Sequence, residues 1–259
     1  DSTPDPGPKP TISSIAVTKP TVTDYKVGDT FDATGLAVTA TMANGIDSGY
    51  VVDLGCGTGK LTTLLADAGY DMIGIDNSFD MLDMALERED DRILYLMQDM
   101  REFEPGEKVS AVVSACDSIN YILEPEDLQA VFFCVSESLK EGGIFIFDIN
   151  TPYKYEVLMA DNTIAENRDE GSFIWDNYYD ADEKINEYDL TLFIKEQSED
   201  EDDIYKKFEE THFQRCYEIS ELKELLEQSG LVFDAVYDAY TDDQVKCDSE
   251  KVTVIAHKA

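Results

Sequence analysis

The sequence is short of basic residues and of histidine. It has 20 Lys and Arg against 56 Asp and Glu, which gives a formal net charge of −36, and it has only 2 His. A surface with this charge repels the phosphate backbone, so we expect no nucleic-acid partner. Two histidines do not provide a His-rich metal site, and we expect no bound metal.

Paired cysteines and long apolar runs are also missing. The 5 Cys are widely spaced without a Cys-x-x-Cys pair, which favours reduced thiols and a cytoplasmic location over a disulfide framework or a zinc site. No apolar run approaches the ~20 residues of a membrane-spanning helix, so we expect no membrane partner. The hydrophobic fraction of 43% is still large enough for a core.

Three alternating glycines stand between a predicted strand and a predicted helix. Residues 51–54 form the strand pattern, residues 60–68 form the helical pattern, and Gly55, Gly57 and Gly59 lie between them. A strand that ends in glycines and opens a helix exposes backbone N–H groups to a ligand. This turn is therefore the first candidate binding site.

Spacing excludes two phosphate-binding motifs at this turn. A P-loop needs Gly-x-x-x-x-Gly-Lys-Ser/Thr, but Leu61 follows Lys60 and Leu54 occupies the first glycine position. A dinucleotide fingerprint needs Gly-x-Gly-x-x-Gly, and Lys60 occupies its third glycine position. A nicotinamide-dependent oxidoreductase is therefore disfavoured.

Strand and helix patterns alternate from residue 50 onward, which predicts an α/β fold with a mostly parallel sheet. Gly142 and Gly143 predict the turn before the strand at residues 144–147. Ligands bind such sheets at the carboxyl edge of the strands. Acidic residues recur at this edge: Asp53, Asp76, Asp99, Asp117 and Asp148. A carboxylate at Asp76, beside the glycine turn, can accept hydrogen bonds from both hydroxyls of a ribose.

Residues 53–59, 74–78 and 98–100 together resemble the motif set of class I S-adenosylmethionine-dependent methyltransferases. The resemblance extends over roughly residues 50–257. It implies a Rossmann-like sheet of seven strands, the last one antiparallel, with S-adenosyl-L-methionine as the cofactor. The residues that it assigns to the cofactor are Asp53, Gly55, Cys56, Gly57, Gly59, Asp76, Asn77, Gln98, Asp99, Met100 and Cys116.

The resemblance also implies how these residues would divide the cofactor among them. The glycines would lie alongside its methionine and ribose portions, and Asp76 would accept hydrogen bonds from the ribose hydroxyls. Asp99 and the Met100 amide would read the adenine edge, while the Cys116 carbonyl would lie near the methionine ammonium. Because a sulfonium methyl group is already activated, in-line positioning and exclusion of water can supply much of the catalysis.

Residues 172–217 interrupt the alternation and predict three strands of an inserted antiparallel β-sheet. Some small-molecule N-methyltransferases of this class carry a similar insertion, which covers the acceptor and can pair two subunits. We therefore expect a small-molecule acceptor, with an amine favoured, and a homodimer joined through the inserted sheet. His212 is the candidate catalytic base. The candidate acceptor residues are Asn120, Tyr121, Asn150, Tyr153, Tyr178 and Arg215.

The chain before residue 46 differs from the rest. Residues 1–10 predict a proline-rich tail, and residues 46–259 predict the methyltransferase domain, with residues 172–217 as its insertion. Residues 11–45 form a short β-rich segment that resembles the opening half of bacterial immunoglobulin-like repeats of surface proteins. The class normally has one or two helices at this place, which close over the cofactor.

Two interpretations of function remain open. The first is methyl transfer from S-adenosyl-L-methionine to a small-molecule acceptor by in-line displacement. The alternative is a surface or binding protein, or a secreted one, that acts through its immunoglobulin-like segment and carries an inactive methyltransferase-like domain.

Overall fold

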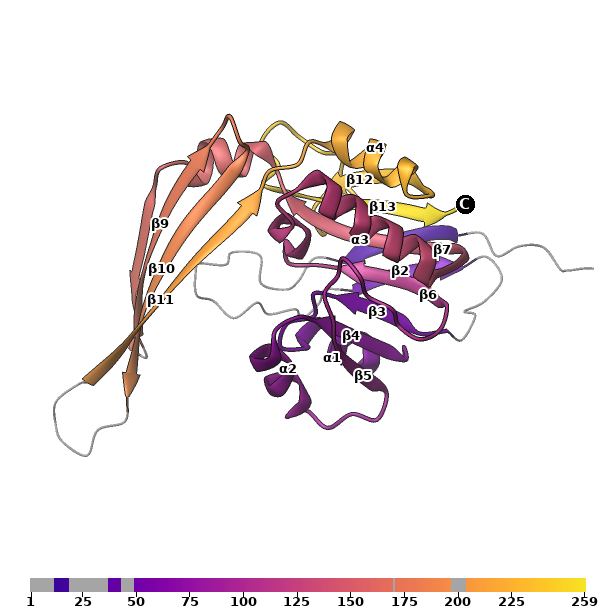
Figure 1. Ribbon diagram of the computed structural model, residues 1–259, viewed down its shortest axis with the longest axis horizontal. Coiled ribbons are helices and arrows are strands. Elements are labelled where there is room, and N and C mark those ends of the chain that lie inside the picture. The colour runs from indigo at the N-terminus through magenta and orange to yellow at the C-terminus, as the bar shows by residue number, and fades with distance from the viewer. Residues whose placement is uncertain (1–11, 19–36, 43–48, 170, 197–203) are drawn as a thin grey trace, which may run out of the picture.

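The computed structural model describes residues 12–18, 37–42, 49–169, 171–196 and 204–259 (Figure 1). A seven-stranded sheet forms its centre. In spatial order its strands are β12 (Leu231–Asp238), β13 (Lys251–Lys258), β7 (Leu139–Asn150), β6 (Val109–Ser114), β3 (Val51–Leu54), β4 (Met72–Asp76) and β5 (Ile93–Met97). The five strands from β7 to β5 are parallel, and β13 is antiparallel to both of its neighbours. This is the Rossmann-like α/β fold that the sequence predicts.

Helices cover both faces of the sheet. They are α1 (Lys60–Asp67), α2 (Phe79–Leu86), α3 (Pro125–Ser138) and α4 (Ile219–Gln228). Because side chains alternate along a strand, neighbours on β3 enter different cores. Val52 belongs to the cluster under α3 and α4, whereas Val51 belongs to the cluster under α1.

Local sequence explains where two of these helices begin. The Ser78 hydroxyl accepts a hydrogen bond from the Met81 N–H at 3.3 Å and caps α2. Pro125 occupies the first turn of α3, where its missing N–H would have no partner in any case. The apolar positions of α3 recur at helical spacing and are buried: Leu128, Val131, Phe132 and Val135.

A second sheet projects from the body and is called the arm below (Figure 1). Its strands, in spatial order, are β11 (Ile204–Arg215), β10 (Ile185–Glu196), β9 (Gly171–Asp180) and β8 (Thr163–Asn167), and neighbours are antiparallel. The sequence predicts three of these strands and misses β8, which has only five residues. The pairing of two subunits through this sheet stays a prediction.

The start of β7 differs from the sequence prediction. The strand begins at Leu139 rather than after Gly142 and Gly143. The register between β6 and β7 shifts between Val109 and Ala111, and Gly142 adopts a φ of 72° at this irregularity. Residues 140–143 thus stand opposite the single residue Ser110, and regular pairing resumes at Ile144, where the sequence predicts the strand to begin.

The described part of the N-terminal segment is one strand pair. Strands β1 (Ile12–Thr18) and β2 (Ala37–Met42) are antiparallel, with Thr18 opposite Ala37. Two strands do not make an immunoglobulin sandwich, and the rest of the segment lies outside the described residues. No helix in the described part of the chain is long and apolar enough to cross a membrane.

The core under α3 contains a tight aromatic group, which makes a stability test possible. The Phe132 ring centroid lies 5.7 Å from that of Phe145 and 5.5 Å from that of Phe147, and all three side chains are buried. We expect Phe132→Ala to lower the free energy of unfolding by about 3–5 kcal/mol, because it leaves a cavity among these rings. Urea denaturation measures the change.

The adjacent residue on α3 is the matched control. Phe133 is 57% exposed, so Phe133→Ala should change the free energy of unfolding by less than about 0.5 kcal/mol. Equal losses in the two variants would contradict the packing described for α3.

Candidate active site

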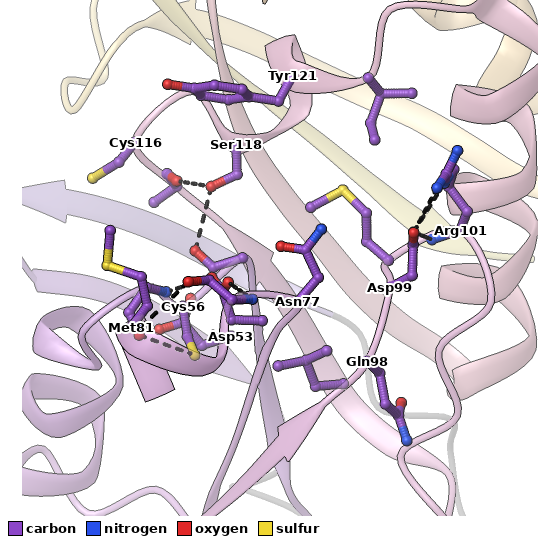
Figure 2. Close-up of a pocket in the computed structure, with 18 of the residues that line it drawn as sticks. Asp53, Cys56, Asn77, Met81, Gln98, Asp99, Arg101, Cys116, Ser118 and Tyr121 are labelled. Atoms are coloured by element: carbon purple, nitrogen blue, oxygen red, sulfur yellow. Dashed lines mark hydrogen bonds and ion pairs between the residues drawn. The ribbon is translucent and has the colours of Figure 1, made fainter. Parts of the chain in front are cut away.

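A cavity of about 910 Å³ opens where β3, β4, β5 and β6 end. Residues that follow these four strands line it, together with the start of α2 and one residue of the arm, His212. The carboxyl edge of the parallel strands is thus the floor of the cavity, as the sequence predicts for a ligand site. Figure 2 shows Asp53, Cys56 and Cys116 on one side of it, with Asp99 and Arg101 on the other.

The three glycines of the turn are constrained in different ways. All have positive φ: 77° at Gly55, 52° at Gly57 and 70° at Gly59. A Cβ on Gly59 would lie 2.2 Å from the Tyr95 hydroxyl, and one on Gly55 would lie 2.7 Å from the Ser118 hydroxyl. A Cβ on Gly57 would meet nothing within 4 Å, so this residue presents bare backbone to open space in the cavity.

Asp76 ties the glycine turn to the start of α2. Its Oδ2 accepts the Gly57 N–H at 2.8 Å, and its Oδ1 accepts the Ser78 N–H at 2.9 Å. A carboxylate offers about four acceptor positions, so each oxygen still has one free for a ligand. The exposed Asn77 follows it directly and also lines the cavity.

On the far side of the cavity, Asp99 is paired with Arg101. Its two carboxylate oxygens accept from Arg101 Nε at 3.0 Å and Nη2 at 2.6 Å, and Arg101 Nη1 reaches Asp127 at 2.9 Å. These hydrogen bonds from Arg101 lower the pKa of Asp99. Gln98 stabilises the same loop: its Nε2 donates to the Glu104 carbonyl, and its Oε1 accepts from the Glu104 N–H. Met100 also lines the cavity.

Tyr121 of η1 and His212 of the arm form one wall of the cavity. The Tyr121 hydroxyl lies 2.6 Å from the Tyr188 hydroxyl and 3.4 Å from His212 Nδ1. His212 Nε2 lies 3.1 Å from a Glu210 carboxylate oxygen, and its ring stacks on Tyr188 with the centroids 4.8 Å apart. Tyr188 stands directly opposite His212 in the β10–β11 register.

The other five acceptor candidates do not line the cavity. Asn120 and Asn150 are buried. Asn120 lies in η1 (Ser118–Tyr121), and its Nδ2 donates a hydrogen bond to the Arg215 carbonyl of the arm at 2.8 Å. Its Oδ1 accepts a hydrogen bond from the Asn150 N–H of β7 at 3.0 Å. The Arg215 guanidinium forms an ion pair with Glu221, with 3.7 Å between Nη2 and Oε1. Tyr178 is 57% exposed on the arm face opposite His212, and Tyr153 lies before η2 (Lys154–Met159).

Comparison with known proteins identifies the family. The profile of a family described as "Methyltransferase domain" matches residues 51–143. YqeM of Bacillus subtilis, which is named as a methyltransferase, is 33% identical over 216 residues, covering 82% of this chain and 85% of YqeM. The chain belongs to the methyltransferase family.

Two further relatives extend the comparison. The crystal structure of an S-adenosylmethionine-dependent methyltransferase from Clostridium acetobutylicum superposes with a TM-score of 0.74 at 28% identity, over 81% of this methyltransferase and 84% of that chain. A Streptomyces venezuelae enzyme named dTDP-3-amino-3,4,6-trideoxy-alpha-D-glucopyranose N,N-dimethyltransferase is 33% identical over 115 residues, 44% of this chain and 47% of its own. The cofactor of this methyltransferase is S-adenosyl-L-methionine. The family match begins at residue 51, so it gives no support to the immunoglobulin-like segment or to the alternative function built on it.

The cavity fits this cofactor. Its lining includes the carboxylates of Asp53 and Asp76, which suit a ligand that carries a positive sulfonium and a positive ammonium. The open side of Gly57 leaves room for close approach of the ligand to the backbone. Within the described ranges, no group of three or more His, Cys, Asp or Glu side chains is arranged to hold a metal.

Sequence reasoning missed several residues of this site. Ser118 and Met81 line the cavity, and Tyr188 contacts Tyr121, which also lines it. Ser118 directly follows a predicted strand end, so its position was available in the sequence. Tyr188 had no such signal, because only the β10–β11 register brings it to His212.

Asp53 is buried at the bottom of the site and should couple stability to pH. Burial raises the pKa of its carboxyl to about 6, against the hydrogen bond that Thr62 donates at 2.6 Å. The folded state therefore holds this proton more tightly than the unfolded state does. Its contribution to stability is largest below about pH 4 and is lost as the pH rises through about 6.

We expect Asp53→Asn to remove this part of the pH dependence. The difference in free energy of unfolding between the variant and the natural chain should change by about 2 kcal/mol between pH 4 and pH 7. Urea denaturation at a series of pH values measures it. Asp71→Asn, at an exposed aspartate before β4, is the control, and an equal change there would contradict the assignment to Asp53.

Proposed function

We propose that this methyltransferase transfers the methyl group of S-adenosyl-L-methionine to an amine of a small-molecule acceptor. The observation that carries the proposal is the group formed by Tyr121, Tyr188, His212 and Glu210 at the cavity wall. This group can take a proton from an acceptor that lies next to the methyl donor.

The proposed cofactor placement follows the order of residues across the cavity. Cys116 would receive the methionine ammonium, Gly55, Gly57 and Gly59 would pass the methionine and ribose, and Asp76 would hold the ribose hydroxyls. Asp99 and the Met100 amide would take the adenine. In Figure 2 Cys116 and Asp99 lie on opposite sides with Asn77 between them, which supports this direction.

The acceptor would lie against Tyr121. In Figure 2 Tyr121 lies on the side of Cys116 and Ser118, away from Gln98. With the cofactor in the proposed direction, this side is the methionine end. When bound, the cofactor supplies an activated methyl group on its sulfonium there, so an acceptor at Tyr121 would be within reach of it.

The hydrogen-bond partners of His212 indicate which nitrogen can act as a base. A carboxylate only accepts hydrogen bonds, so the contact with Glu210 places the proton of the neutral ring on Nε2. Nδ1 then has a free lone pair, which faces the Tyr121 hydroxyl. Glu210 would in this way hold the ring in the tautomer that accepts a proton at Nδ1.

Tyr121 would pass the proton rather than keep it. Burial raises the pKa of Tyr121, and burial raises that of Tyr188 as well, so both remain neutral phenols at physiological pH. The Tyr121 hydroxyl can donate to His212 Nδ1 while it accepts a proton from the acceptor. An amine needs this step, because it reacts only as the neutral form and is mostly protonated near pH 7.

Two of the matching relatives support an amine on a small molecule. The Streptomyces venezuelae enzyme that matches 44% of the chain is named for N,N-dimethylation of an amino sugar nucleotide. A second matching enzyme, from Streptomyces fradiae, is named for N,N-dimethylation of dTDP-3-amino-3,6-dideoxy-alpha-D-glucopyranose. These names are the reason that amino sugar nucleotides are the first acceptors to test.

The function is tested with a matched pair of acceptors. The purified protein is incubated with S-adenosyl-L-methionine and either a dTDP-3-amino-6-deoxy sugar or the same dTDP-sugar with a hydroxyl in place of the amine. We expect a mass gain of one or two methyl groups on the amino compound alone, detected by mass spectrometry. Methylation of the hydroxyl compound, or of neither, would contradict the proposed acceptor.

The proton acceptor is tested by comparing the two histidines. We expect His212→Gln to lower kcat by about 100-fold or more while the affinity for S-adenosyl-L-homocysteine stays unchanged, because the lost group acts on the acceptor. His257→Gln is the control, since His257 also pairs with a carboxylate, Asp234 at 2.8 Å, but lies outside the cavity. Equal activity of the two variants would exclude His212 as the base.

A further inference from the structure

Two consecutive residues after β6 adopt a backbone conformation that side chains disfavour. Cys116 has a φ of 59° and Asp117 a φ of 55°, and neither is glycine. A non-glycine residue in this left-handed region is held there by its surroundings. The first of the two lines the cavity, so the strain lies at the site itself.

A single buried carboxylate holds this corner in place. Asp148 lies on β7 and is 2% exposed. Its Oδ2 accepts the Cys116 N–H at 2.9 Å, and its Oδ1 accepts the Asp117 N–H at 2.6 Å. Two successive N–H groups converging on one anion form a binding nest, which here is occupied by a side chain of the same protein.

Asp148 is fixed from its other side as well. The Tyr240 hydroxyl donates a hydrogen bond to its Oδ2, and Lys251 Nζ lies 3.7 Å from its Oδ1. Lys251 is also bound to the Asp117 carboxylate at 2.7 Å, and Gln214 of the arm donates to that carboxylate at 2.7 Å. Burial opposes the charge on Asp117, but Lys251, Lys154 and these hydrogen bonds hold its pKa well below the ordinary value.

The hydrogen bond to Asp148 determines where the Cys116 carbonyl points. The bond between Cys116 and Asp117 is a trans peptide, in which the N–H and the C=O point in opposite directions. Because the Asp117 N–H points to Asp148, the Cys116 carbonyl points away from Asp148, and Cys116 itself lines the cavity.

We propose that Asp148 is a positioning residue for the cofactor, which holds the Cys116 carbonyl where it accepts a hydrogen bond from the methionine ammonium. Asp148 does not line the cavity, so it acts through the backbone of the corner and not on the ligand. This inference rests on the placement of the methionine end under Proposed function, and it does not depend on the identity of the acceptor.

Asp148→Asn tests the inference with two probes. Asparagine keeps one acceptor oxygen and replaces the other with an N–H donor, so one of the two corner N–H groups loses its partner. We expect the affinity for S-adenosyl-L-homocysteine to fall about tenfold or more, because a hydrogen bond from a charged ammonium is weakened. The affinity for 5′-methylthioadenosine, which lacks the ammonium and carboxylate, should change by less than about twofold. Calorimetric titration measures both.

A second variant guards against misfolding. Lys251 keeps its contact with Asp117 in Asp148→Asn, so no buried ammonium is left unpaired. Tyr240→Phe removes only the hydroxyl that donates to Asp148, and it should weaken S-adenosyl-L-homocysteine about threefold with 5′-methylthioadenosine unchanged. Asp234→Asn, on β12 and outside the cavity, is the control that should bind both probes normally.

The binding and activity measurements distinguish the role of Asp148 from the cofactor site and from the proposed acceptor. Equal losses for the two probes, or no loss for either, would overturn the positioning role of Asp148. Failure of the natural chain to bind S-adenosyl-L-homocysteine would instead overturn the cofactor site. Failure to methylate any amine, with the predicted split between the probes intact, would overturn only the proposed acceptor.

Discussion

The site depends on one carboxylate, that of Asp76, and on the hydrogen bonds that two backbone N–H groups donate to it. Gly57 belongs to the turn after β3, and Ser78 caps α2. The carboxylate thus ties the glycine turn to the start of α2, still has free acceptor positions, and lines the cavity. The positive φ of Gly57 makes the contact possible, because a side chain there would disfavour the conformation. The link between the glycine turn and α2 and the proposed ribose contact both depend on this carboxylate.

The parallel part of the fold could be predicted because its signals are local. Each strand is a short apolar run, each helix has its own cap or periodic face, and each strand end carries a polar residue that reaches the same edge. The spacing of the three glycines needed no tertiary information. For this reason the sheet and the cofactor family followed from the sequence, and the comparisons confirm both.

What the sequence left open depends on register and on side-chain direction. Strand β8 was missed, and Tyr188 meets His212 only through the pairing of β10 with β11. Asn120 and Asn150 follow strand ends, as a ligand-binding residue would, but their amides are used up in joining η1, β7 and the arm. Proximity to the carboxyl edge therefore locates a site, while the competing demand of buried backbone groups for partners decides which side chains can face it.

Strand β11 has a consequence for how the reacting parts are spaced. His212 and Gln214 are two residues apart and share one face of the strand, so their Cα atoms are separated by about 6.6 Å. His212 contacts Tyr121 at the cavity wall, and Gln214 donates a hydrogen bond to Asp117, next to Cys116. The spacing between the proposed base and the corner at Cys116 is thus set by the rise of a β-strand, which stretches very little.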